Sequence, residues 1–148
     1  MFTEIKNVFG IISIIFLLLS CSRGDIVEPA PYDNPEISLN IPTGFPALNS
    51  SVITNKPTKY GVELGERLFN EKKFSADNTI SCASCHNKSN AFTDNNARAI
   101  GIYGRVGLRN TPPIQNMAFM QFYNWDGKIL QLEKQPLVPI ITHEEMNS

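Results

Sequence analysis

The chain has 148 residues, 42% of them apolar, and a formal net charge of −1. This length and apolar content fit one modest globular domain and exclude a disordered chain. The balanced charge gives no indication of a nucleic-acid partner.

A nearly unbroken apolar run at residues 8–19 ends within the stretch L18-L-S-C-21. The run is too short to span a bilayer, which indicates the core of a signal peptide. It resembles a bacterial lipoprotein signal, so we predict that residues 1–20 are removed and that Cys21 carries lipid. A free thiol or a disulfide partner is the alternative for Cys21. The lipoprotein interpretation predicts a periplasmic protein that is anchored to the membrane through this lipid.

The next segments contain several prolines and little apolar periodicity. Residues 21–36 are acidic and proline-rich, which predicts a flexible tether. Residues 41–50 are interrupted by proline and predict an extended segment that wraps along the domain. The domain itself is therefore expected over residues 37–148.

The first helix is predicted over residues 57–73. Leu64 and Leu68 lie on one apolar stripe at helical spacing, and Asn55 or Thr58 is a suitable N-cap. Shorter helices are predicted over residues 81–86, 110–117 and 129–135, with polar and glycine-rich loops between them. No stretch alternates as a strand does. The fold class is therefore mostly α with long loops, which need something further to organise them.

Two of the three cysteines lie in the stretch C82-A-S-C-H86. Side chains three and four residues apart share a helical face, so Cys82, Cys85 and His86 project to one side. Two thiols and an imidazole in this pattern are the attachment signature of c-type haem. We therefore predict one covalent haem c, attached by Cys82 and Cys85, with His86 as the proximal ligand of its iron.

Three other interpretations of this motif are weaker. A zinc site needs four ligands, usually in two pairs, and only His143 remains to join this one. A thioredoxin-like redox pair would follow a strand in a βαβ pattern, which the sequence lacks. A disulfide between Cys82 and Cys85 would be strained at so short a separation.

Six short motifs occur in order between Leu64 and Met146, namely LG..LF, SC.SCH, AF.D, G..G.RN.P, WDG and EM. Together they resemble the N-terminal half of the bacterial dihaem cytochrome c peroxidases, over residues 37–148. The resemblance implies a cytochrome c-like haem domain that is one half of a two-domain protein. In that family the N-terminal haem reduces hydrogen peroxide to water, and the C-terminal haem receives electrons from a small redox protein, a cytochrome c or a copper protein.

The resemblance also implies roles for four further residues. Glu145 matches the distal glutamate that moves a proton between the peroxide oxygens, and Gln135 matches the glutamine beside it. Trp125 matches a tryptophan between the two haems. Asn110 matches a residue that in many members contributes to a calcium site.

Each of these residues also has a purely structural interpretation. T142-H-E-E145 fits a capping box, in which Glu145 only caps a helix. Trp125 would be a core anchor, Gln135 a helix-surface residue and Asn110 a helix cap that needs no metal.

The sequence departs from the family pattern at two points. Ile102, with Tyr103 as the nearest polar side chain, stands where some members carry a histidine that binds the resting iron. We therefore expect an iron open on its distal side and ready to react without reductive activation. His143, next to the Glu145 segment, has two interpretations, a distal-pocket group and a surface residue, and we expect the second. The chain also has one C-x-x-C-H motif and ends soon after Glu145. We therefore expect a truncated chain, with the second haem domain supplied from elsewhere.

The function expected from the sequence is peroxide reduction by the peroxidatic half of a dihaem peroxidase. The alternative is a non-enzymatic monohaem electron carrier with Met117, Met120 or Met146 as the sixth iron ligand, although such methionines are more often core filler. A third interpretation is an oxidase that acts on a protein partner through a related dihaem scaffold.

Overall fold

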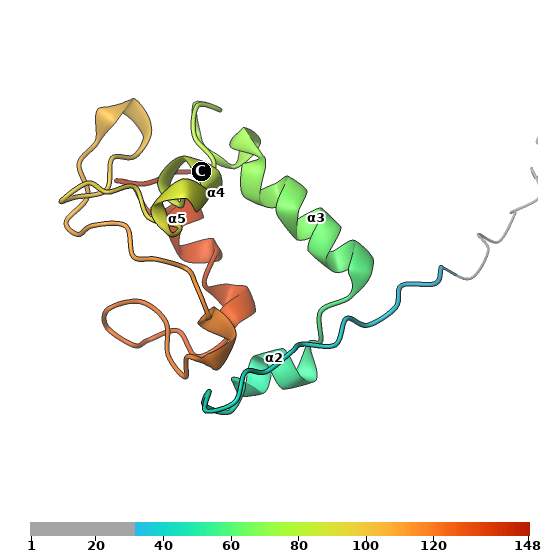
Figure 1. The fold of residues 1–148 in the computed structure, drawn as a ribbon. Helices are drawn as coiled ribbons and strands as arrows, with labels where there is room; N and C mark the ends of the chain where they lie inside the picture. Colours follow the sequence, from blue (N-terminus) through green and yellow to red (C-terminus); the bar gives the residue numbers. More distant parts are fainter. Residues whose placement is uncertain (1–31) are drawn as a thin grey trace, which may run out of the picture. The chain divides into compact units, whose positions relative to one another are not determined.

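The computed structural model describes residues 32–148, and residues Asn34–Ser148 form one compact unit (Figure 1). The predicted signal peptide, Cys21 and the first part of the predicted tether lie outside the described residues. Four α-helices are present in the described part: α2 (Ser50–Thr54), α3 (Lys59–Asn70), α4 (Cys82–Cys85) and α5 (Leu137–Ile141). Five 3-10 turns join them, at Lys72–Phe74, Lys88–Asn90, Ile102–Gly104, Met117–Phe119 and Leu132–Lys134.

Extended pairing within residues 32–148 is limited to isolated bridges, such as Ile100 with Val106 and Tyr123 with Ile129. The predicted fold class, mostly α with long loops, is therefore confirmed. None of the helices in this part of the chain is long and apolar enough to cross a bilayer.

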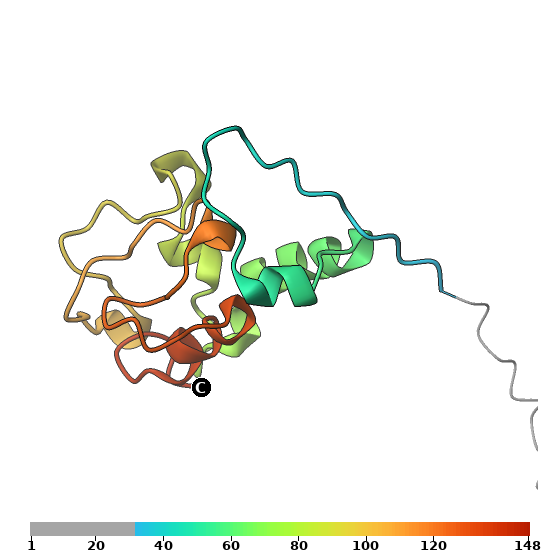
Figure 2. The ribbon, with the colours of Figure 1, turned by 90° about the horizontal axis from the view of Figure 1, so that it is seen from below.

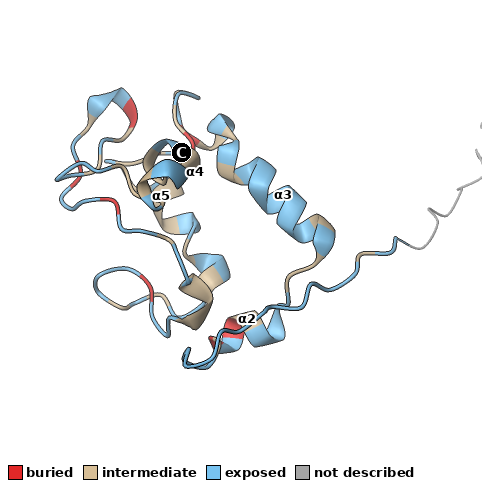
Figure 3. Ribbon diagram, viewed as in Figure 1, coloured by how far each residue is buried: buried red, intermediate tan, exposed pale blue. Residues whose placement is uncertain are grey.

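Helix α3 forms where the apolar stripe predicted it. The Thr58 hydroxyl accepts the Gly61 N–H at 3.2 Å and caps the N-terminus. The helix ends at Asn70, and the predicted last turn is a separate 3-10 turn. No residue of α3 is buried (Figure 3). Leu64 is 55% exposed. The apolar stripe of α3 therefore has little protein packed against it.

Residues Asn34–Ile37 run beside the start of α3. The Ile37 N–H donates to the Pro57 carbonyl at 2.8 Å, and the Lys59 N–H donates to the Pro35 carbonyl at 3.0 Å. Part of the predicted tether thus contacts the helical domain, and its exact boundary stays a prediction.

Helix α2 was not predicted, because five residues are too few to show a period. It depends on Asn49, which is 2% exposed and accepts the Ser51 N–H at 2.8 Å. The Asn49 amide also donates to the Met120 carbonyl at 2.9 Å and the Leu130 carbonyl at 3.2 Å. The Ser51 hydroxyl accepts the Leu132 N–H at 3.2 Å, so α2 lies against the turn Leu132–Lys134 (Figure 2).

Two predicted helices are wrong. Residues 111–114 have no regular structure, because the adjacent Pro112 and Pro113 lack N–H donors. Asn116 has a left-handed conformation with φ of 57°, which is incompatible with a right-handed helix. Residues 129–135 do not form one helix, because the Ile129 carbonyl accepts the Tyr123 N–H at 2.8 Å in a bridge. Helical structure is displaced to Leu132–Lys134 and α5.

The apolar core within the described residues is small. Its buried members are Ile102, Tyr123 and Met146. A domain of this size normally buries more apolar surface than that. The fold therefore has exposed apolar surface available for another group.

Candidate haem site

The C-x-x-C-H motif lies on α4 and ends at His86, as predicted. The Ser84 hydroxyl accepts the Ser81 N–H at 3.0 Å, and the His86 N–H donates to the Cys82 carbonyl at 2.9 Å. Cys82 and Cys85 are both half-buried and free of disulfide. The helix thus holds two reduced thiols directly before the histidine.

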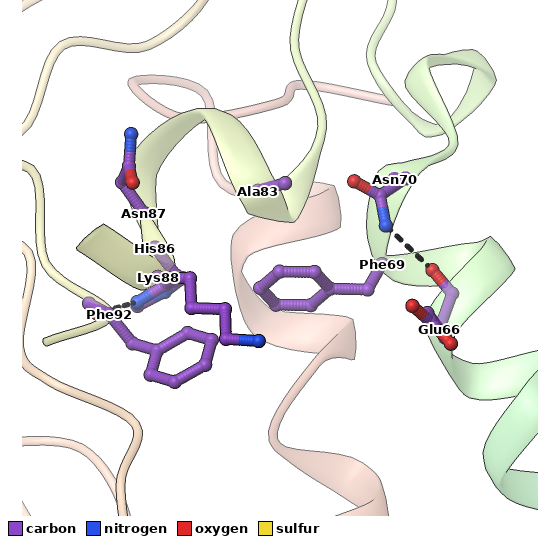
Figure 4. A pocket seen from close by; sticks show the side chains of 8 residues that line it. All are labelled: Glu66, Phe69, Asn70, Ala83, His86, Asn87, Lys88 and Phe92. Atoms are coloured by element: carbon purple, nitrogen blue, oxygen red, sulfur yellow. Dashed lines mark hydrogen bonds between the residues drawn. The ribbon is translucent and has the colours of Figure 1, made fainter. Parts of the chain in front are cut away.

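The His86 ring is held by the backbone of the following loop. Its Nδ1 lies 3.0 Å from the Phe92 carbonyl oxygen (Figure 4). Because a carbonyl oxygen only accepts, Nδ1 carries the proton and Nε2 keeps its lone pair for a metal. Sequence reasoning missed this contact, because it joins a side chain to a backbone oxygen and leaves no residue-type signal.

The loop that carries this carbonyl has an unusual backbone. Ala91 and Phe92 both have left-handed conformations, with φ of 54° and 60°. The Phe92 N–H donates to the Asn87 carbonyl at 2.8 Å, and the Thr93 hydroxyl donates to the Thr111 carbonyl at 2.8 Å. Two strained residues in succession persist only where the surroundings hold them. The loop therefore presents the Phe92 carbonyl to His86 in a defined position.

A cavity of about 440 Å³ lies beside His86, between α3 and α4. Figure 4 shows Phe69 projecting from α3 and Phe92 lining the cavity near His86. The remaining lining residues are Glu66, Asn70, Ala83, Asn87 and Lys88. Two free thiols, an imidazole with Nε2 available and exposed apolar side chains fit a covalently attached haem.

Burial raises the pKa of both thiols. For Cys85 the negative charges of Asp94 and Glu145 raise the pKa further. The Cys85 Sγ lies 3.9 Å from the Ile100 carbonyl oxygen, and the Ile102 N–H donates to the Glu145 carbonyl at 2.9 Å. The segment that carries Glu145 therefore lies close to the haem-attachment helix.

Glu145 is half-buried, and its pKa is raised by burial and by the neighbouring charge of Glu144. The capping box is not formed. The Thr142 hydroxyl donates instead to the Val138 carbonyl at 2.7 Å, while the Glu145 N–H closes a turn on the Thr142 carbonyl at 3.0 Å. Both the capping interpretation and the catalytic role of Glu145 therefore stay predictions.

Trp125 and Gln135 lie at one loop. Trp125 is 68% exposed, which contradicts a core anchor, and the Arg109 guanidinium lies 5.8 Å from its ring centre. The Gln135 amide donates to the Asn124 side-chain oxygen at 2.7 Å. This contact ties Gln135 to the loop of Trp125.

The other predicted residues lie as follows. Asn110 is exposed and caps no helix, so that structural alternative is wrong. His143 is exposed as expected, with Nδ1 3.5 Å from a Glu144 carboxylate oxygen. Among the methionines, Met146 is buried and Met120 is 46% exposed. Within residues 32–148, no three His, Cys, Asp or Glu side chains are grouped closely enough to hold a metal ion.

A mostly α domain with a C-x-x-C-H helix and an oriented histidine is a c-type cytochrome domain. The family model described as di-haem cytochrome c peroxidase matches residues 59–148, and the chain belongs to this family. The predicted family resemblance is thereby confirmed, and the family implies haem c as the cofactor.

The relatives include peroxidases and MauG proteins. The methylamine utilization protein MauG of Methylorubrum extorquens is 42% identical over 94 residues, which cover 63% of this chain and 26% of that protein. The cytochrome c peroxidase Ccp of Escherichia coli is 38% identical over 87 residues, covering 59% of this chain and 19% of the relative.

A solved structure also resembles this fold. It is described as a MauG-like protein associated with microbial copper homeostasis, with a TM-score of 0.68 and 30% identity over 76% of this chain and 33% of that one. The chain thus spans about a quarter of the length of the M. extorquens relative.

Proposed function

We propose that this chain forms the peroxidatic haem c domain of a dihaem peroxidase, which reduces hydrogen peroxide to water with electrons from a small redox protein. The observation that carries the proposal is the contact between His86 Nδ1 and the Phe92 carbonyl, on the helix that presents both thiols. Relatives named as peroxidases support the reaction class, among them the cytochrome c551 peroxidase of Nitrosomonas europaea, 38% identical over 86 residues.

Three residues would hold the haem. Cys82 and Cys85 would form its thioether bonds, and His86 Nε2 would bind the iron. When bound, the haem supplies a redox-active iron that can accept a peroxide oxygen. The Phe92 carbonyl keeps His86 in one tautomer and orientation, and this increases the basicity of the ligating nitrogen.

Glu145 would move the proton. Cleavage of the peroxide bond needs a group that takes a proton from one oxygen and returns it to the other, and a single carboxyl can do both. Because burial and Glu144 raise its pKa, Glu145 keeps a proton to higher pH than an exposed glutamate does. With two electrons and two protons, one peroxide then yields two molecules of water.

Four further features belong to this proposal. Cys21 carries the lipid anchor, the protein lies in the periplasm, a second haem domain receives the electrons, and Asn110 contributes to a calcium site. Metabolic lipid labelling of the parent chain and of a Cys21→Ser variant would test the lipid anchor. Protease accessibility in cells with a permeabilised outer membrane would test the periplasmic location.

The central experiment replaces Glu145 with Ala in the haem-loaded chain, supplied with a second haem c domain. Loss of a general acid–base group should lower peroxide turnover by about two to four orders of magnitude. Glu63→Ala is the control, because this carboxylate on α3 is exposed and should leave turnover nearly unchanged. Equal turnover in the two variants would show that Glu145 takes no part in the proton transfer.

A further inference from the structure

The glycine-rich loop at residues 99–107 contacts the segment that carries Glu145. The Ile102 N–H donates to the Glu145 carbonyl at 2.9 Å. The Arg105 guanidinium donates through Nη1 to the His143 carbonyl at 2.7 Å. Ile102 and Arg105 thus donate to the backbone carbonyl oxygens of Glu145 and His143.

Gly101 permits this close approach. A Cβ at Gly101 would lie 2.6 Å from the Glu145 carbonyl oxygen and nearer still to that of Glu144, both of them backbone atoms. The φ of Gly101 is −93°, which other residues adopt easily, so space and not conformation requires glycine here. Any side chain at this position would push the two segments apart.

The loop is itself held in place. The Gly101 N–H donates to the Arg105 carbonyl at 2.8 Å, and the Gly107 N–H to the Ala99 carbonyl at 2.8 Å. Ile102 is 1% exposed and Met146, directly after Glu145, is 4% exposed, so both segments are anchored by buried side chains.

The loop also reaches the haem-attachment helix. The Cys85 Sγ lies 3.9 Å from the Ile100 carbonyl oxygen, one residue before Gly101. Residues 100–102 therefore connect the attachment cysteine on one side with the Glu145 backbone on the other.

We propose that Gly101, Ile102 and Arg105 are positioning residues, which hold Glu145 at a fixed place relative to Cys85 and hence to the attached haem. The inference deepens the proposed function and rests on it, since it assigns a purpose to the placement of Glu145. It requires that the two segments stay docked in the haem-loaded chain.

Gly101→Ala tests this inference in the haem-loaded chain, with Gly65→Ala as the control, because a Cβ at Gly65 in α3 meets no atom within 4 Å. Hydrogen exchange of the Ile102 amide should accelerate at least about tenfold in Gly101→Ala and stay unchanged in the control. Cyanide association with the ferric haem should slow about tenfold, because hydrogen cyanide must lose its proton to a placed base. Unchanged exchange and unchanged cyanide association in Gly101→Ala would overturn the proposal.

Arg105→Met keeps the proposal testable if Gly101→Ala does not fold. It removes the bond to the His143 carbonyl without inserting atoms between the segments, and should accelerate Ile102 exchange by a smaller factor. Glu145→Gln separates the inference from the proposed function. Faster Ile102 exchange in the loop variants, with normal cyanide association in Glu145→Gln, would support the docking and refute the proton-transfer role. Slow cyanide association in Glu145→Gln alone, with both loop variants behaving as the parent chain, would refute the positioning role.

Discussion

Glu145 is half-buried next to Glu144, a placement that favours its proposed chemistry and costs stability. Burial and the Glu144 charge raise its pKa in the folded protein. Above the ordinary pKa of about 4.3 for glutamate the unfolded chain releases this proton, while the folded protein retains it. The contribution of Glu145 to the free energy of unfolding is therefore full at low pH and falls as the pH rises through the raised pKa.

Glu145→Gln should thus stabilise the haem-loaded protein at neutral pH. Glutamine resembles the protonated carboxyl and has no charge to desolvate, so the gain in melting temperature should be small near about pH 4 and larger near about pH 8. Thermal unfolding followed by circular dichroism at several pH values measures this gain. A gain that stays constant with pH would contradict the raised pKa, and Glu63→Gln serves as an exposed control.

Among the elements, α3 is the one most dependent on a partner. It has twelve residues, none of them buried, and Val62, Leu64 and Leu68 are all exposed. Isolated helices of this length are marginal in water, and their stability comes from the packing of the apolar face. Its observed neighbour is the short helix α4.

Haem attachment should therefore protect α3. In the Cys82→Ala/Cys85→Ala variant, which cannot attach haem covalently, the α3 amides should exchange at least about tenfold faster than in the haem-loaded chain. Amides around Asn49 are the internal reference, because that buried side chain is held by protein hydrogen bonds. Equal protection of α3 in both forms would show that the helix is stable without the cofactor.

For the whole molecule, the number of redox centres would limit the proposed reaction. Peroxide reduction consumes two electrons, and these 148 residues carry one C-x-x-C-H motif. The matching residues cover 26% of the methylamine utilization protein MauG of Methylorubrum extorquens.

The 148-residue chain should consequently react with peroxide about once per haem and show little sustained turnover with a reduced cytochrome donor. Supplying a second haem c domain, in cis or as a separate chain, should restore turnover. Stopped-flow spectroscopy of the single reaction and steady-state assays of donor oxidation distinguish these cases. Rapid steady turnover by the chain alone would show that a second haem is not needed.

The sequence alone predicted the family, the haem-attachment motif and helices over residues 57–73 and 81–86. The structure places these helices at Lys59–Asn70 and Cys82–Cys85. Cys82, Cys85 and His86 act within one turn, and the α3 stripe repeats within one helix, so local spacing is sufficient to identify them. The helices predicted at 110–117 and 129–135 failed because adjacent prolines and the bridge between Tyr123 and Ile129 override weak local patterns.

Only the tertiary structure decided how the site is held together. The Phe92 carbonyl that orients His86 and the Ile102 amide that binds the Glu145 carbonyl are backbone groups, which every residue type carries. Gly101 lies beside the Glu144–Glu145 backbone, more than forty positions away in the sequence. The spacing of residues along the chain does not predict such contacts, because they depend on which loops the fold brings together.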